Sequence, residues 1–268
     1  MEAVSKEPWL TKVRLCVLLT GELCSRPLLE AAEQVIAGGA QMIQLREKKL
    51  SDPSTKLRVA LRLSRQRSRT RQGRSKGDRE ILKLADALRA MTLRSGTLFF
   101  VNDRPDIALM CGADGVHLGQ DDLPVARTRE FLASQAPGRR MWHSCPSCET
   151  IIPSRGRLGH LFIGASTHSL DQAKAAAAAG ADYVAIGPVF PTKTKGFTLK
   201  VHEHGVGTGL VAEVARAVRL PVIAIGGITA ENAGEVIKAG AHAVAVCSAI
   251  ISAKDIRAAT EKLLAALL

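Results

Sequence analysis

Aromatic residues are scarce in this sequence, at 3% of its 268 residues. Ala, Val, Ile and Leu instead carry most of the apolar content, which reaches 46%. This balance is more typical of alternating strands and helices than of a β-sandwich. The apolar fraction also suffices for a substantial core, which excludes a chain that is disordered as a whole.

Long apolar runs are absent as well. No run approaches the roughly 20 residues of a membrane-spanning helix, and residues 1–12 lack the apolar stretch of a signal peptide. We therefore expect a cytoplasmic protein with no membrane partner. The chain has six cysteines, Cys16, Cys24, Cys111, Cys145, Cys148 and Cys247. We expect them to be reduced thiols rather than three disulfides.

Acidic residues are outnumbered by basic ones, 25 against 37, and the formal net charge is +12. Between Lys56 and Arg79, ten basic residues stand against one acid, Asp78, and supply +9 of this charge. A charge run is most often a solvated segment; contact with RNA or another polyanion, and an electrostatic funnel for phosphorylated substrates, are the alternatives. The run lacks the interleaved aromatics of a single-strand binder, so nucleic acid is not the expected partner.

Short β-branched runs alternate with Ala-rich helical stretches along the chain. The expected strands are 14–19, 42–45, 98–101, 115–118, 162–164, 183–186, 222–225 and 243–246, and the expected helices include 27–37, 78–93, 170–179, 230–239 and 253–266. Most strands are continuously apolar, as parallel strands buried on both faces are. The pattern predicts an α/β fold, a single (β/α)8 TIM barrel over residues 13–268; a doubly wound open sheet is the alternative.

Glycines mark the ends of three expected helices, in Ala37-Gly38-Gly39-Ala40, Ala179-Gly180-Ala181 and Ala239-Gly240-Ala241. We expect them to cap these helices in the left-handed conformation.

Two segments interrupt the alternation. Residues 53–77 hold most of the basic run, and we expect a solvated or disordered insertion there. Residues 139–161 form a second insertion, in which Cys145 and Cys148 lie between His143 and His160. That spacing is compatible with zinc, but a single CxxC pair without a second one favours free thiols in a loop.

Polar residues that follow the carboxyl ends of barrel strands face the active site. After the second strand, alternation places Gln44, Arg46 and Lys48 on one side, where they can meet an anion. After the third and fourth strands, Asp103 and either Asp121 or Asp122 can hold a hard divalent cation. Basic side chains and a metal ion that face each other across the opening at these strand ends, the mouth of the barrel, indicate a diphosphate site.

A second anion site is expected on the other side of the mouth. The sixth strand runs into Thr192-Lys193-Thr194-Lys195, the seventh into Gly226-Gly227, and the eighth into Cys247-Ser248. Glycines and small residues at the last two strands are typical of the phosphomonoester site of these barrels. Two anion pockets in one mouth predict a two-substrate transferase.

Each of these features also has a structural interpretation. Arg46 and Lys48 can be a surface charge pair, Ser169 a helix N-cap, and Gly227 a close packing contact. His117 and His168 are interpreted as hydrogen-bonded structural histidines rather than catalysts.

As a set, the strings after the strands closely resemble the thiamine phosphate synthase family over about residues 13–264. They are Gln44-Leu45-Arg46-Glu47-Lys48, Val101-Asn102-Asp103-Arg104, His117-Leu118-Gly119-Gln120-Asp121-Asp122, Gly164-Ala165-Ser166-Thr167-His168-Ser169, Gly187-Pro188-Val189-Phe190-Pro191-Thr192-Lys193-Thr194-Lys195 and Ile225-Gly226-Gly227-Ile228. The resemblance implies that a pyrimidine diphosphate and a thiazole phosphate condense to thiamine phosphate and pyrophosphate. It further implies Mg²⁺ as the cofactor and departure of the diphosphate before the thiazole nitrogen captures the pyrimidine cation.

The resemblance also implies a role for each matching residue. Asp103 and Asp122 would hold Mg²⁺, and Arg46, Lys48, Asn102 and Lys195 the diphosphate. Gln44 would contact the pyrimidine, Ser166 would lie near its amino group and the leaving diphosphate, and Thr192, Thr194, Gly227, Cys247 and Ser248 would surround the thiazole phosphate. Lys48, Ser166 and Lys195 are the implied catalytic residues.

Two other functions compete with the synthase. A related thiazole tautomerase shares the barrel but has no need for the diphosphate and metal residues. A catalytically silent barrel that binds polyanions through residues 56–79 is the third interpretation. Homo-oligomerisation is left open by the sequence.

Overall fold

The structure is a computed structural model, and it describes residues 12–24, 26–47, 75–135, 161–192 and 205–267. Its strands form one closed parallel barrel in chain order, because β1 (Leu15–Leu19) pairs with both β2 (Met42–Leu45) and β8 (Ala243–Val246). The predicted (β/α)8 barrel is confirmed, and the open sheet is wrong.

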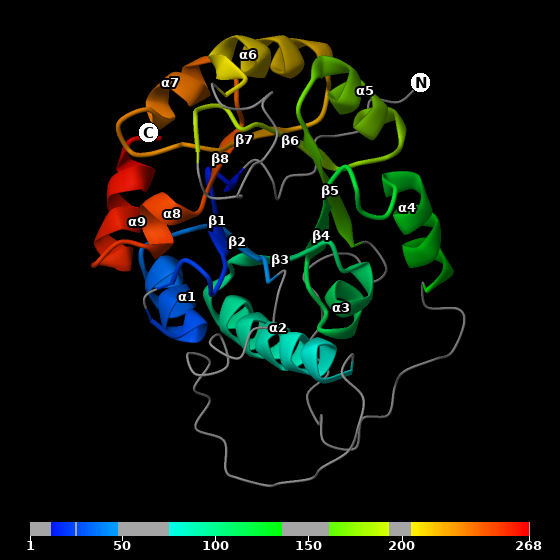
Figure 1. The fold of residues 1–268 in the computed structure, drawn as a ribbon, viewed down its shortest axis with the longest axis vertical. Coiled ribbons are helices and arrows are strands. Elements are labelled where there is room, and N and C mark those ends of the chain that lie inside the picture. The colour runs from blue at the N-terminus through cyan, green and yellow to red at the C-terminus, as the bar shows by residue number, and fades with distance from the viewer. Residues whose placement is uncertain (1–11, 25, 48–74, 136–160, 193–204, 268) are drawn as a thin grey trace, which may run out of the picture.

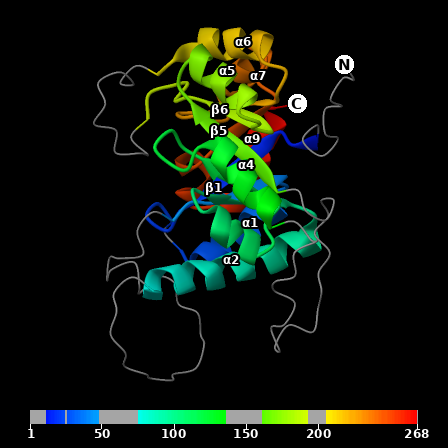
Figure 2. The same cartoon turned by 90° about the vertical axis from the view of Figure 1, so that its right-hand side faces the viewer.

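The remaining strands are β3 (Leu98–Asn102), β4 (Gly115–Leu118), β5 (Phe162–Thr167), β6 (Tyr183–Ile186) and β7 (Val222–Ile225). The helices described are α1 (Leu28–Ala37), α2 (Ser75–Ser95), α3 (Pro105–Met110), α4 (Val125–Ser134), α5 (Leu170–Ala178), α6 (Gly207–Ala217), α7 (Ala233–Lys238), α8 (Ser248–Ile251) and α9 (Ile256–Ala265). They surround the ring of strands in Figure 1, and Figure 2 shows α2 and α6 on opposite sides of the barrel. Among these described helices, none combines the length and apolar character that a bilayer span requires.

The apolar core has two layers, as expected when each strand is buried on both faces. The outer layer packs the helices on the strands, with Val17, Ile43 and Val184 fully buried in it. The inner layer fills the barrel and contains the rings of Phe100 and Tyr183. Glycines admit these rings, because a Cβ on Gly115 would lie 2.1 Å from Phe100 Cε1 and one on Gly164 2.0 Å from Tyr183 Cζ.

Most element boundaries agree with the sequence prediction within a few residues, and the exceptions have local causes. The expected helix 78–93 is longer in the structure, where α2 spans Ser75–Ser95. The expected helix 253–266 starts instead at Ile256, because the Asp255 side chain accepts a hydrogen bond from the Ala258 amide at 2.9 Å and caps it. The predicted left-handed caps are confirmed at Gly39, Gly180 and Gly240.

The expected helix 230–239 is also shorter, at Ala233–Lys238. The Asn232 side chain accepts a hydrogen bond from the Thr229 amide at 2.8 Å, which stabilises a turn where the helix was expected to begin. Cys16, Cys111 and Cys247 are free thiols, as predicted. Cys145, Cys148 and most of the basic insertion lie outside the described residues.

A buried ion pair ties the helices to the amino-terminal end of the barrel. Arg89 on α2 lies 2.8 Å from Asp114 Oδ2, and the two side chains are 8% and 7% exposed. The same carboxylate oxygen accepts a hydrogen bond from the Phe99 amide of β3 at 2.8 Å. Asp182, before β6, likewise binds Arg129 and the Ile163 amide. These contacts lie opposite the functional rim and serve stability.

We predict that Asp114→Ala lowers the free energy of unfolding by about 3 kcal/mol or more, because it leaves the Arg89 guanidinium buried without its partner. Urea unfolding measures the effect. As the matched control, Glu130→Gln breaks the exposed Arg127–Glu130 pair and should cost less than about 1 kcal/mol. Equal losses in the two variants would contradict the stabilising role that we assign to the buried Arg89–Asp114 pair.

Candidate active site

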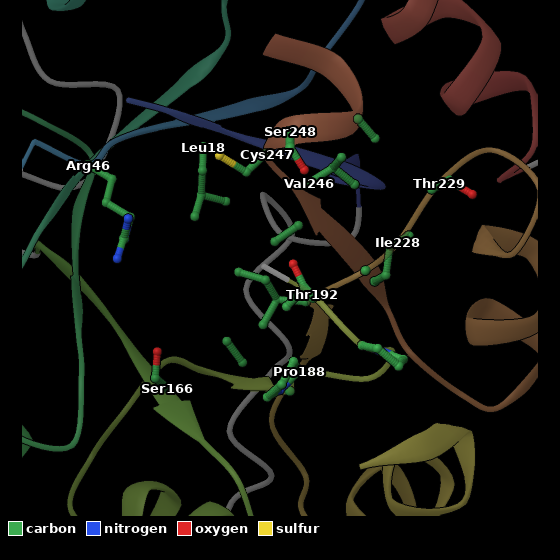
Figure 3. Close-up of a pocket in the computed structure, with 18 of the residues that line it drawn as sticks. Leu18, Arg46, Ser166, Pro188, Thr192, Ile228, Thr229, Val246, Cys247 and Ser248 are labelled. Atoms are coloured by element: carbon green, nitrogen blue, oxygen red, sulfur yellow. The ribbon is translucent and has the colours of Figure 1, made fainter. Parts of the chain in front are cut away.

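A cavity of about 590 Å³ opens at the carboxyl ends of the strands. Figure 3 shows Arg46 and Ser166 on one side of it and Ile228 on the opposite side, with Cys247 and Ser248 above Thr192. The sequence predicted all of these except Ile228 as site residues. Arg46 follows β2 and Cys247 follows β8, and the closed barrel brings the two strand ends to one rim.

A smaller cavity of about 40 Å³ adjoins the first, and Arg46 and Ser166 line both. Gln44, Asn102 and Asp103 line the smaller one. Gln44 Nε2 donates a hydrogen bond to Asn102 Oδ1 at 2.7 Å, which leaves the Gln44 carbonyl and the Asn102 amino group as polar groups of the site. The cavity lined by polar residues after β2 and β3 therefore adjoins the cavity lined by small residues after β7 and β8, as the predicted mouth requires.

The two predicted metal ligands lie at the ends of neighbouring strands. Asp103 has φ 61°, a conformation that non-glycine residues rarely adopt, and its amide donates to the His117 carbonyl at 2.8 Å. Asp122 Oδ2 accepts a hydrogen bond from the Gly119 amide at 2.7 Å, and Gly119 lines the smaller cavity. Asp121 is exposed. This favours Asp122 over Asp121 as the second carboxylate.

Glycine and cysteine shape the opposite half of the larger cavity. Gly227 has φ 65°, and a Cβ there would lie 2.7 Å from Phe190 Cβ. This position therefore needs glycine for both its conformation and its space. Burial raises the pKa of Cys247 to about 12, although Arg46 opposes the shift. The thiol stays protonated at neutral pH and is not a nucleophile.

The two histidines make the hydrogen bonds expected of structural residues. His117 Nδ1 lies 2.8 Å from the Tyr183 hydroxyl and Nε2 lies 2.8 Å from Ser166 Oγ. His168 Nδ1 contacts the Gly187 carbonyl. Ser166 belongs to β5 itself, since it pairs with Ala185, so its predicted place beyond the strand was wrong. Ser169 caps α5, as expected.

Three predicted site residues, Lys48, Thr194 and Lys195, lie outside the described residues. Their proximity to the mouth stays a prediction.

Sequence reasoning missed the apolar side chains of the larger cavity and the role of Glu47. Leu18, Ile225 and Ile228 line the cavity, but in the sequence they are indistinguishable from core residues. Glu47 accepts a hydrogen bond from the Gly21 amide and so holds the β1–α1 loop against the end of β2. Its position between two cations of the Gln44–Lys48 string was the available signal.

A closed (β/α)8 barrel whose mouth combines a carboxylate, an arginine and a glycine-lined cavity is typical of (β/α)8 enzymes that act on phosphorylated substrates. The family model described as thiamine monophosphate synthase matches residues 15–137 and 152–250. The chain belongs to this family.

Curated relatives and a solved structure agree with this family assignment. A thiamine-phosphate synthase of Methanoculleus marisnigri is 39% identical over 236 residues, 87% of this chain and 85% of the relative. One from Chlorobium luteolum is 38% identical over 239 residues, 88% of this chain and 86% of that protein. The structure of a thiamine phosphate pyrophosphorylase from Pyrococcus furiosus superposes with a TM-score of 0.70 at 31% identity, covering 96% of both chains.

Glu47 makes a testable contribution to the pH dependence of stability. Burial raises its pKa, Glu22 adds to the shift, and the Gly21 amide, Arg46 and Thr20 oppose it. Between the ordinary pKa of 4.5 and the raised pKa, Glu47 therefore binds a proton more often in the folded protein than in the unfolded chain. The stabilisation is present below that pH and is lost as the pH rises through the raised pKa.

We predict that Glu47→Gln reduces this loss of stability between about pH 4 and pH 7. Urea unfolding of wild type and variant across this range checks it, with Glu130→Gln as the exposed control. Parallel pH profiles for wild type and Glu47→Gln would rule the interpretation out.

Proposed function

We propose that the protein joins 4-amino-5-hydroxymethyl-2-methylpyrimidine diphosphate to 4-methyl-5-(2-hydroxyethyl)thiazole phosphate, forming thiamine phosphate and pyrophosphate. The observation that carries the proposal is the shared lining of the two cavities, because Arg46 and Ser166 face both. A transferase needs its two substrates in one mouth. The names of the relatives support the same reaction.

Each half of the mouth suits one substrate. Gln44 and Asn102 offer amide groups to the aminopyrimidine, with Arg46 beside them for the diphosphate. Ile225 and Ile228 offer apolar surface to the thiazole ring. Its phosphate would lie against Thr192 and the Gly227, Cys247 and Ser248 backbone, and we propose that Lys48, Thr194 and Lys195 complete the two anion sites.

We propose that Asp103 and Asp122 hold a magnesium ion through their carboxylate oxygens. Over the described residues, no group of three or more His, Cys, Asp and Glu side chains is placed to hold a metal. Two carboxylates are nevertheless sufficient where the diphosphate and water supply the other ligands, which is the coordination that Mg²⁺ prefers. When bound, the ion would neutralise charge on the departing diphosphate.

The protein's own side chains assist bond breaking and bond formation in the rest of the reaction. The C–O bond to the diphosphate breaks with its electron pair going to the leaving oxygen, which Arg46 stabilises. The thiazole nitrogen lone pair then forms the new C–N bond with the pyrimidine methyl cation. The apolar side chains of the larger cavity exclude water, which would otherwise capture the cation. The protonated Cys247 thiol does not compete as a nucleophile.

A thiazole tautomerase has no need for Arg46, Asp103 and Asp122, so their arrangement favours the synthase. Cytoplasmic location stays a prediction, as does the role of the basic insertion.

We predict that pyrophosphate release from the two substrates requires Mg²⁺ and falls about a hundredfold in kcat/KM in Asp103→Asn and in Asp122→Asn. A coupled pyrophosphate assay with and without chelator measures this. Asp121→Asn, which alters the exposed neighbour, is the matched control and should retain wild-type rates. Undiminished turnover without divalent metal would refute the metal assignment.

We predict that Arg46→Gln lowers kcat/KM for the pyrimidine diphosphate by at least about tenfold, because a cation that faces the leaving group is lost. Arg104→Gln is the control at the same rim, since Arg104 pairs with Asp78 and Asp106 and is absent from the lining of both cavities. A greater loss in the control than in Arg46→Gln would contradict the proposed anion site.

A further inference from the structure

Three polar side chains form a hydrogen-bonded chain from the barrel interior to the mouth. The Tyr183 hydroxyl lies 2.8 Å from His117 Nδ1, and His117 Nε2 lies 2.8 Å from Ser166 Oγ. Tyr183 and His117 are 2% and 7% exposed. All three line the smaller cavity, but only Ser166 of the three also lines the larger one. Figure 3 shows the side chains of Ser166 and Arg46 pointing toward the same space.

The strand register builds this chain. His117 on β4 is the partner of Gly164 on β5, and Gly164 is in turn the partner of Tyr183 on β6. Gly164 has no side chain, so the two rings meet across it, with centroids 5.6 Å apart and planes 27° from parallel. Ser166 lies two residues beyond Gly164, on the same face and nearer the mouth.

Burial determines which atom donates in the first of these hydrogen bonds. It raises the pKa of Tyr183 well above its ordinary value, so the phenol keeps its proton. Within the described residues, the hydrogen bond shown for this hydroxyl is the one to His117 Nδ1. If Nδ1 were the donor, the buried phenol hydrogen would be left without an acceptor, which is costly. Tyr183 is therefore the donor and Nδ1 the acceptor.

The direction of the second hydrogen bond follows from the direction of the first. A neutral imidazole that accepts at Nδ1 carries its hydrogen on Nε2, so His117 donates to Ser166 Oγ. The hydroxyl hydrogen of Ser166 is then directed away from the histidine. In the opposite arrangement, Ser166 would donate to Nε2 and present lone pairs to the mouth, which would repel an anion.

We propose that Tyr183 and His117 are positioning residues that make the Ser166 hydroxyl a hydrogen-bond donor toward the mouth. The inference rests on the proposed function in one respect, that the acceptor is an oxygen of the departing diphosphate. Diphosphate oxygens accept hydrogen bonds and gain charge as the C–O bond breaks, so a donor held toward them acts mainly in the transition state.

Nitrogen-15 NMR of the imidazole rings tests the hydrogen-bond directions in the enzyme without substrates. The His117 signals are assigned by their loss in His117→Gln. We expect wild-type His117 to be protonated at Nε2 and unprotonated at Nδ1, and Tyr183→Phe to give a mixture of the two tautomers. A wild-type proton on Nδ1 would overturn the proposal, whatever the enzyme's activity.

Kinetics test whether Tyr183 acts through Ser166. Tyr183→Phe keeps the ring and should lower kcat about tenfold while leaving KM for both substrates within about twofold. In a Ser166→Ala background the same substitution should lower kcat no further, because the hydroxyl it positions is gone. An equal loss in both backgrounds would indicate a merely structural role and refute the proposal.

Phe100→Leu is the matched packing control. Phe100 contacts the Tyr183 ring edge-on, with centroids 5.8 Å apart, but carries no polar atom. It should lower the melting temperature without changing the His117 tautomer or kcat. If the wild type fails to release pyrophosphate, the proposed function fails, while the NMR result still decides the direction of the two hydrogen bonds.

Discussion

The hydrogen-bonded pairing of β1 with β8 closes the sheet, and the active-site mouth depends on this closure. All strands run parallel, so closure gathers their carboxyl ends at one rim. Arg46 follows β2 and Cys247 follows β8, yet both line one cavity because β1 lies between those strands. In an open sheet of the same strand order, the two residues would lie near opposite edges.

The two adjoining cavities at the mouth suit two different chemical tasks. The smaller cavity is lined by amides, a carboxylate, Arg46 and the polar rings of His117 and Tyr183; in the proposed reaction, Arg46 faces the charged leaving group. The larger cavity combines apolar side chains with glycine backbone at Gly227, which suits a ring that bears a phosphate. Ser166 lies where the two meet, and a buried tyrosine and histidine support it from below. In the proposed reaction, charge stabilisation and exclusion of water are thus the tasks of adjacent surfaces.

Much of the candidate site could be predicted because strand ends in a parallel barrel share one face. That rule identified Arg46, Asp103 and Gly227 from residues that follow apolar runs, and the structure places all three at the mouth. It could not identify Tyr183, which lies within a strand, or the link from His117 to Ser166. The apolar lining, such as Ile228, was also missed, because cavity and core positions carry the same side chains.

The sequence by itself determined the alternation of strands and helices, the glycines that end helices, and the polar residues that follow each strand. Hydrophobic periodicity and turn chemistry are local, so one chain reveals them. Only the tertiary structure decided that His117 meets Tyr183, 66 positions away, across Gly164. Such contacts depend on the register between neighbouring strands and on barrel closure, which arise from packing of the whole chain rather than from any one segment.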